Sequence, residues 1–209
     1  IYTQKGLMVD YDRLILATGS KPFIPPVQGS DLKGVLSFRD IYDVKKMLEY
    51  CQSKRNAVVI GGGLLGLEAA YGLKQRGMNV TVLHLMDRIM DRQLDAKASQ
   101  MLQTAIEQKG ISIITQANTE ELLGEDGHVS QVRLKDGTIL AADLVIFAVG
   151  IRPNMALAQS AGLRCNRGVL VNDTMQTYDP SIYAVGECIE HRQQTFGLVE
   201  PLWGQAFIC

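Results

Sequence analysis

The chain has 209 residues, enough for one large core or for one complete domain with parts of a second. Its 21 Lys and Arg residues nearly balance its 22 Asp and Glu residues, and a net charge of -1 predicts no attraction to nucleic acid or to an anionic membrane. No apolar run approaches the roughly 20 residues that span a bilayer, and the first residues lack the pattern of a signal peptide. We therefore expect a cytoplasmic protein that binds small molecules or other proteins.

The cysteines are scattered along the chain, at Cys51, Cys165, Cys188 and Cys209. None forms the closely spaced pair that would hold zinc, an iron–sulfur cluster or a redox disulfide. We therefore predict buried or incidental thiols, and no transfer of electrons through a dithiol of this segment.

The first predicted element is a buried strand at residues 14–17, which ends at Gly19. The prolines and glycine of residues 22–29 cannot continue a helix or a central strand, so this stretch is predicted to be an extended connector. Apolar residues then recur at helical spacing from Ile41 to Cys51 and predict a helix.

A βαβ unit follows, with strands at residues 57–60 and 79–84 around a glycine-rich turn and a helix. The first strand is apolar throughout, as in a parallel sheet covered on both faces. Small and apolar residues of the helix fall on one face and are predicted to pack on the sheet: Gly66, Ala69, Ala70, Leu73 and Gly77.

A second helix is predicted from the spacing of Leu94, Ala98, Met101, Leu102, Ala105 and Ile106, and it leads to a strand at residues 111–115. Short alternating segments from 118 to 140, separated by Asp126-Gly127 and Asp136-Gly137, predict an antiparallel meander in place of the next crossover helix. A buried strand at 143–149 ends at Gly150. Two short strands are predicted between Gly168 and Cys188, the second at 182–185.

The turn of the βαβ unit has the pattern G-x-G-x-x-G and consists of Gly61, Gly62, Gly63, Leu64, Leu65 and Gly66. In such a loop the first glycine makes a tight turn, the second lets the backbone approach a pyrophosphate, and the third packs the helix on the strand. The diphosphate lies on the positive helix N-terminus. Because a strand precedes this motif and a helix and second strand follow it, we predict a dinucleotide site.

The acidic residue that would bind the adenine ribose of NAD at the end of the second strand is missing, and His84 takes its place. A neutral histidine can hydrogen-bond a ribose, and Arg88 and Arg92 are close enough in sequence to meet a 2′-phosphate. Alternatively, these arginines form a solvated face with Asp87, Asp91 and Asp95. The choice between NADH and NADPH therefore stays open.

Glu68 lies just beyond the third glycine, in the first turns of the helix. It is either a carboxylate stabilised by the helix dipole or a contact to the nicotinamide end of the nucleotide.

Three segments stand in an order that resembles one flavoprotein family: 14–19 (LILATG), 61–68 (GGGLLGLE) and 177–187 (TYDPSIYAVGE). This is the FAD-dependent pyridine nucleotide-disulfide oxidoreductase family, which includes glutathione reductase and ferredoxin reductases. Residues 84–86, 91–95, 186–192 and 201–203 resemble its subgroup of assimilatory NAD(P)H nitrite reductase large subunits, in which Glu187 replaces the aspartate of most members.

The resemblance implies a role for residues in each segment. Thr18 and Gly19 would lie near the flavin, Gly186 and Glu187 would contact FAD, and Gly61 to Gly66 with Glu68 would hold NAD(P)H. Gly150 is included among the cofactor-binding residues, and Arg152-Pro153-Asn154 matches the exit from the nucleotide domain. Trp203 would either cover the flavin or fill a domain interface. No residue is assigned to general acid, base or nucleophilic catalysis, because the cofactors carry the hydride chemistry.

The family also has an FAD-binding strand and glycine motif of its own, which residues 1–30 do not supply. We therefore expect an incomplete FAD site, with residues 1–34 and 156–209 as parts of an FAD-binding domain and residues 35–155 as the NAD(P)H-binding domain. Siroheme and an iron–sulfur cluster are expected only in a longer parent protein, together with downstream redox domains and a small subunit. The oligomeric state stays open, a homo-oligomer included.

The predicted fold class is α/β: a Rossmann-like NAD(P)-binding domain with an antiparallel β-meander crossover, flanked by parts of a second, FAD-binding domain. The predicted function is passage of hydride from NAD(P)H to FAD and of electrons onward to nitrite through domains outside this chain, so this segment alone is expected to be inactive. The alternatives are a ferredoxin or rubredoxin reductase, and a non-catalytic binding protein that responds to NAD(H).

Overall fold

The computed structural model describes all residues from Ile1 to Cys209, and these form two compact units. Unit 1 consists of Ile1–Lys21 and Ile151–Cys209, and unit 2 consists of Pro22–Gly150. The short strands β2 (Ser20–Pro22) and β11 (Ile151–Pro153) lie where the chain passes between the units. The sequence also predicts domain boundaries at 34/35 and 155/156. These boundaries assign segments to cofactors rather than to compact units, and they remain a prediction.

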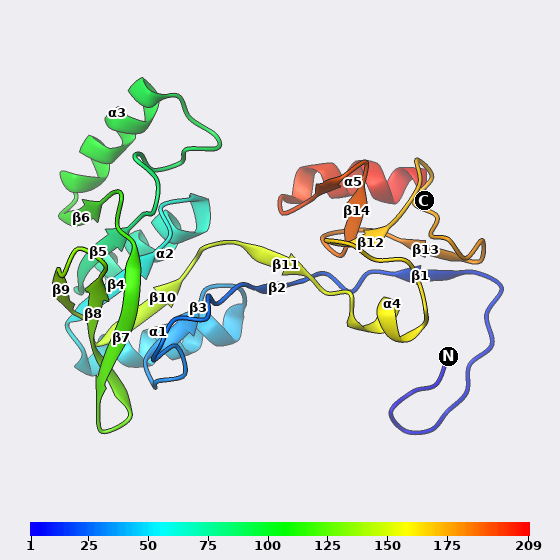
Figure 1. The fold of residues 1–209 in the computed structure, drawn as a ribbon, viewed down its shortest axis with the longest axis horizontal. Helices are drawn as coiled ribbons and strands as arrows, with labels where there is room; N and C mark the ends of the chain where they lie inside the picture. The colour runs from blue at the N-terminus through cyan, green and yellow to red at the C-terminus, as the bar shows by residue number, and fades with distance from the viewer. The chain divides into compact units, whose positions relative to one another are not determined.

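Unit 2 is built on a five-stranded parallel sheet with the order β3-β10-β4-β5-β6 (Figure 1). Its strands are β3 (Val35–Ser37), β4 (Asn56–Ile60), β5 (Asn79–Leu83), β6 (Ile111–Ile114) and β10 (Leu144–Phe147). Four of these strands are predicted from the sequence. The edge strand β3 is not, because three residues after a proline-rich connector are too few to show a strand's alternation of apolar and polar residues.

Alternate residues of each central strand pack into two different hydrophobic cores, one on each face of the sheet. Ala57 and Val59 of β4 face the helices α1 (Ile41–Ser53) and α2 (Leu64–Gln75), whereas Val58 faces the meander. A third helix, α3 (Ala96–Glu107), contacts β6. The sheet is therefore covered on both faces, which explains why its strands are apolar throughout.

The meander is confirmed as β7 (Thr119–Glu125), β8 (His128–Leu134) and β9 (Ile139–Ala141), which pair antiparallel. Asp126 and Gly127 both have positive φ, 51° and 76°, as a two-residue hairpin turn requires. Because β10 follows directly, the meander replaces a crossover helix.

One predicted helix contact is wrong. Gly77 does not pack on the sheet: it lies beyond the end of α2, exposed, with φ +85°, so it terminates the helix. Met101 of α3 is 66% exposed, because α3 lies at the edge strand β6 and buries a narrower face than its apolar spacing suggests.

Unit 1 brings together segments that are distant in sequence. β1 (Leu14–Leu16) pairs in parallel with β13 (Ile182–Ala184), and Figure 1 shows the two strands side by side. A second sheet contains β12 (Val169–Leu170), β14 (Ile189–His191) and β15 (Gln194–Thr195). Two helices, α4 (Ala156–Ser160) and α5 (Val199–Ile208), complete the unit.

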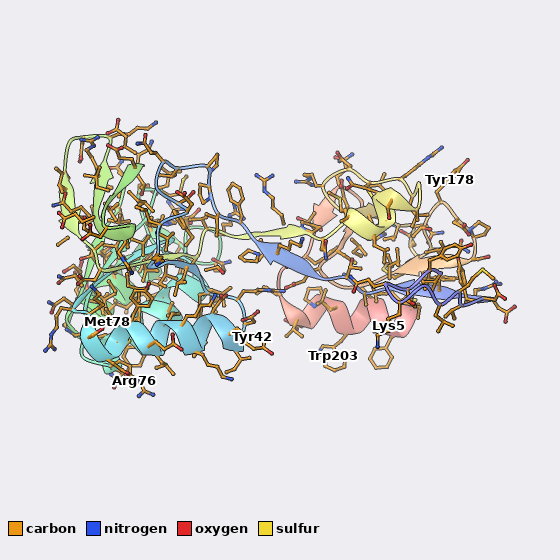
Figure 2. The ribbon with its side chains drawn as sticks, turned by 90° about the horizontal axis from the view of Figure 1, so that it is seen from below. Lys5, Tyr42, Arg76, Met78, Tyr178 and Trp203 are labelled. Atoms are coloured by element: carbon orange, nitrogen blue, oxygen red, sulfur yellow. The ribbon has the colours of Figure 1, made fainter.

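The core of unit 1 is smaller than either core of unit 2 and joins both parts of the chain: Leu16 packs with Val169, Ala184 and Ile189. Trp203 of α5 is 66% exposed (Figure 2), so within this unit it fills no interior position. No helix of the protein is long and apolar enough to cross a membrane.

Candidate nucleotide-binding site

The glycine-rich turn of unit 2 connects β4 to α2. Gly61 has φ +125°, and a Cβ there would lie 2.3 Å from the carbonyl oxygen of Ala148. A Cβ at Gly66 would lie 1.8 Å from the carbonyl oxygen of Gly61. Gly61 and Gly66 are therefore required by the fold itself, whatever the loop binds.

Gly63 differs from its neighbours, because a Cβ at this position would meet no atom within 4 Å. Its φ of -89° and ψ of -174° are open to any residue. Packing within the chain therefore does not require glycine at this position. A glycine here would instead let an external group approach the backbone closely, as the second glycine of a dinucleotide loop does.

The N-terminus of α2 is uncapped, unlike those of the two other long helices in unit 2. The Asp40 side chain accepts hydrogen bonds from the first N–H groups of α1, and Asp95 does the same for α3. Gly63 offers α2 no side chain, and the N–H groups of Leu64 and Leu65 have no acceptor within the chain. This end of α2 combines unpaired donors with the positive end of the helix dipole and so suits an anion.

The side chains around this helix end are solvent-exposed. Leu64 and Leu65 are large apolar residues left exposed at the first turn. Glu68 lies in the second turn of α2 with its side chain exposed, so its carboxylate is available to a ligand. Gly150, directly before β11, has φ +114° and open space where a Cβ would be.

His84 follows β5, as the sequence predicts, and the ring contacts the glycine loop directly. Its Nδ1 accepts a hydrogen bond from the Gly62 N–H at 3.0 Å, and its Nε2 lies 3.1 Å from Oδ1 of Asp91. A Cβ at Gly62 would come within 2.9 Å of the His84 ring. The second residue of the motif is thus glycine because the histidine packs against it.

The predicted arginines differ from each other. Arg88 pairs with Asp87 at 3.2 Å and is about half buried, and its Nε has no hydrogen-bond partner. Arg92 is exposed. Of the three aspartates proposed as a solvated face, only Asp87 pairs with an arginine, since Asp91 contacts His84 and Asp95 caps α3.

In unit 1, the predicted flavin-side residues lie at strand ends held by side-chain hydrogen bonds. The Thr18 hydroxyl donates to the Asn154 carbonyl at 2.7 Å, and the Asn154 N–H donates to the Gly19 carbonyl at 2.9 Å. The Ser20 hydroxyl donates to the Glu187 carboxylate at 2.7 Å. Gly19 and Gly186 have φ of +64° and +93°, with open space beside each α-carbon.

Gln205 of α5 is a contact that sequence reasoning missed. Its Oε1 accepts a hydrogen bond from the Gly186 N–H at 2.7 Å, and its side chain is only 5% exposed. Its Nε2 is buried without a partner in the chain. A buried donor of this kind is costly unless it meets an acceptor, so the surroundings of Gly186 suit a ligand that carries one.

Glu190 is a buried carboxylate of the same unit. It accepts hydrogen bonds from the N–H groups of Arg167 and Gly168 and from the Asn166 amide. Burial raises the pKa of this carboxyl, but the hydrogen bonds outweigh burial and hold the pKa below its ordinary value. Glu190 thus ties the loop before β12 to β14 and has a structural role.

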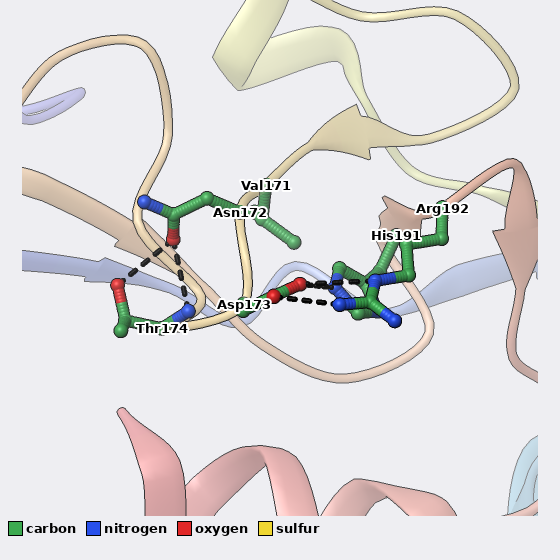
Figure 3. A pocket seen from close by; sticks show the side chains of 6 residues that line it. All are labelled: Val171, Asn172, Asp173, Thr174, His191 and Arg192. Atoms are coloured by element: carbon green, nitrogen blue, oxygen red, sulfur yellow. Dashed lines mark hydrogen bonds and ion pairs between the residues drawn. The ribbon is translucent and has the colours of Figure 1, made fainter.

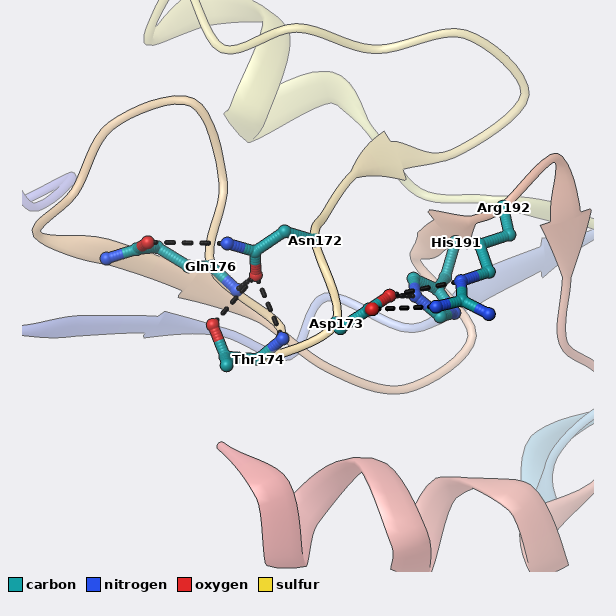
Figure 4. A network of polar contacts seen from close by, with 6 residues as sticks. All are labelled: Asn172, Asp173, Thr174, Gln176, His191 and Arg192. Carbon is teal, nitrogen blue, oxygen red and sulfur yellow. Dashed lines mark hydrogen bonds and ion pairs between the residues drawn. The ribbon is translucent and has the colours of Figure 1, made fainter.

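An open pocket in unit 1 is lined mainly by polar and charged residues that contact one another (Figure 3). His191 and Arg192 both contact the Asp173 carboxylate, and their hydrogen bonds, that of Arg192 first, lower the pKa of Asp173. The neighbouring Asn172 accepts from Thr174 and Gln176 and closes a turn (Figure 4). We interpret this network as surface hydrogen bonds and ion pairs that hold the end of β14 to the loop after β12.

A parallel sheet with a G-x-G-x-x-G turn, an uncapped helix and a meander defines an α/β dinucleotide-binding fold. The model of the pyridine nucleotide-disulphide oxidoreductase family matches residues 2–204, and the chain belongs to that family. The resemblance inferred from the three motifs is therefore confirmed, as is the fold class.

Two similar curated proteins come from Bacillus subtilis (strain 168). Nitrite reductase [NAD(P)H] is 53% identical over 206 residues, which are 99% of this chain and 26% of the relative. The assimilatory nitrate reductase electron transfer subunit is 47% identical over 205 residues, covering 98% of this chain and 26% of the relative. The chain thus spans about a quarter of the length of these proteins.

Among solved structures, the covalent putidaredoxin reductase–putidaredoxin complex superposes with a TM-score of 0.90 at 32% identity. The match covers 98% of this chain and 52% of that chain.

Proposed function

We propose that this chain is the nucleotide-binding segment of an NAD(P)H-dependent flavoprotein reductase. Residues 35–155 bind NAD(P)H, and residues 1–34 and 156–209 contribute to an FAD site. When bound, the nicotinamide supplies a hydride and the flavin accepts it. The protein's part is to bind and orient both cofactors.

One observation in unit 2 carries the proposal: the N-terminus of α2 has no cap and meets open space at Gly63. A pyrophosphate would accept hydrogen bonds from the free N–H groups of Leu64 and Leu65 and would lie at the positive helix end. The exposed apolar side chains of these leucines would be covered by the nucleotide.

The FAD part of the proposal rests on the chain's own residues in unit 1. The unpaired Nε2 of Gln205 needs an acceptor, and the strand-end glycines Gly19 and Gly186 leave room for a ligand next to the backbone. A flavin nucleotide offers acceptors in its ribityl and pyrophosphate groups, so the residues present fit the cofactor.

We further propose nitrite as the final electron acceptor, reached through siroheme and iron–sulfur domains outside this segment and with a small subunit as partner. The support is similarity to the Bacillus subtilis nitrite reductase. Stopped-flow mixing of the full-length flavoprotein with NADH tests the reductase activity, because the flavin absorbance must bleach. An unchanged flavin band would favour a non-catalytic nucleotide-responsive protein, and reduction of a ferredoxin or rubredoxin but not of nitrite would favour the electron-carrier alternative.

The nucleotide site is tested by Gly63→Ala. We expect this variant to fold normally, since the added methyl meets nothing, and to lose about 10-fold or more in NADH affinity because the methyl blocks the pyrophosphate. Titration calorimetry measures the affinity. Gly72→Ala is the matched control, because Gly72 lies on the same helix, also with open space, and should leave binding unchanged. Equal affinity in both variants would argue against a pyrophosphate at this loop.

A further inference from the structure

The end of β5 is the position from which a Rossmann unit normally presents an acidic side chain to the adenine ribose. β5 ends at Leu83, and the next residue is His84 rather than Asp or Glu. A negative charge is nevertheless present at this point of the fold, because Asp91 contacts the His84 ring.

The hydrogen bonds of His84 fix which of its nitrogens carries the proton. The Gly62 N–H can only donate, so Nδ1 of His84 is an unprotonated acceptor. The neutral ring then carries its proton on Nε2 and donates it to Asp91. With a side chain that is 12% exposed and both nitrogens engaged, His84 has no group left for a ribose. It is a positioning residue.

The segment between His84 and Asp91 is held against the glycine loop by its backbone. The Met90 N–H donates to the Gly62 carbonyl at 2.9 Å, and Met90 has φ +51°, which non-glycine residues seldom adopt. Ile89 is fully buried, and its carbonyl accepts a hydrogen bond from the Ser99 hydroxyl at 2.7 Å. The chain therefore folds back on Gly62 and brings the next residue, Asp91, to the strand end.

The Asp91 carboxylate keeps acceptor capacity for a ligand. Only Oδ1 is used, by His84, and the side chain is 24% exposed. Ribose hydroxyls donate hydrogen bonds to such a group, whereas a 2′-phosphate is an anion and would be repelled. Of the two arginines predicted to meet a phosphate, Arg88 is paired with Asp87, and Arg92 is exposed next to Asp91.

We propose that Asp91, oriented by His84, takes the place of the missing strand-end acid, accepts a hydrogen bond from the adenine ribose and selects NADH over NADPH. This inference rests on the proposed nucleotide-binding function. The sequence left the choice between NADH and NADPH open, and the inference favours NADH. It assigns the ribose contact to Asp91, seven positions after His84, which occupies the usual position.

The test is titration of the purified chain and its variants with NADH and with NADPH. We expect wild type to bind NADH about 10-fold or more tightly than NADPH, since a hydrogen bond to a charged group has about this effect. Asp91→Asn should weaken NADH binding by about 10-fold and bring the two affinities together, while its amide oxygen still accepts from His84. Glu49→Gln removes one negative charge at an exposed position on α1 of the same unit and should keep the preference.

The outcomes separate this inference from the proposed function. Wild type that binds neither nucleotide would refute the nucleotide site itself. Equal binding of both nucleotides by wild type, or an unchanged preference in Asp91→Asn, would overturn the role of Asp91 and leave the site standing. Thermal melting checks the fold, and Asp91→Ser, which also keeps an oxygen for His84, replaces Asp91→Asn if that variant unfolds.

Discussion

The two units place the glycines that we propose to lie beside ligands in different ways. In unit 2 the glycine loop is a continuous six-residue motif. Its backbone leaves no room for a side chain at Gly66, because Gly66 packs on the carbonyl of Gly61. In unit 1, Gly19 and Gly186 are far apart in sequence, and they follow the same end of a strand pair only because β1 pairs in parallel with β13. The glycine loop of unit 2 is therefore determined by local sterics. The arrangement of Gly19 and Gly186 in unit 1 depends instead on long-range strand pairing and a few buried hydrogen bonds.

Gly66→Ala should have the largest effect on this comparison. A methyl 1.8 Å from the Gly61 carbonyl oxygen must displace α2 from β4, which we expect to destabilise unit 2 by about 3 kcal/mol and to abolish NADH binding. Hydrogen exchange measured by mass spectrometry reports each unit separately. Gly72→Ala in the same helix should instead be neutral or stabilising by up to about 1 kcal/mol. Similar exchange in the two variants would mean that the loop is not sterically determined.

Glu190→Ala should have the next largest effect, in unit 1. It leaves the N–H groups of Arg167 and Gly168 without their acceptor, at a cost of about 2 kcal/mol, so the peptides around β12 and β14 should exchange faster. NADH titration of this variant should match wild type, because the proposed nucleotide loop lies in unit 2. A loss of NADH affinity would contradict the separation of the two sites.

The same carboxylate predicts a pH dependence. Because the folded pKa of Glu190 lies below its ordinary value of 4.5, its contribution to stability is present above that pH and is lost as the pH falls through the folded pKa. Melting of wild type and Glu190→Ala should therefore differ at pH 7 and converge in the acid range below pH 4.5. A constant difference at all pH values would show that the charge of Glu190 is not what stabilises the loop.

Gly186→Ala should have the smallest effect of these substitutions. Its φ of +93° is unfavourable for alanine and costs about 1–2 kcal/mol, although no atom stands in the way of the methyl. Gly204→Ala, at a helical position with open space, is the control and should not destabilise unit 1. Equal melting temperatures for the two variants would show that unit 1 tolerates a change of backbone at the end of β13.

Much of unit 2 could be predicted from the sequence because its signals are local. The apolar run before Gly61 predicts a strand covered on both faces, and the turn at Asp126 and Gly127 predicts the meander hairpin. These features depend on residues within a few positions of each other. Gly77 was misassigned because helical spacing continues past the point where a positive φ ends the helix.

The βαβ unit and its glycine loop can be predicted from the residues alone, because sterics and periodicity act over short distances along the chain. The absence of an acid directly after β5 is likewise visible in the sequence. Three contacts are visible only in the folded chain: β1 pairs with β13, Gln205 reaches Gly186, and Asp91 contacts His84. These contacts join residues that no periodic pattern relates. The polar contacts form because a buried donor is costly without an acceptor, and the folded backbone determines which acceptor lies within reach.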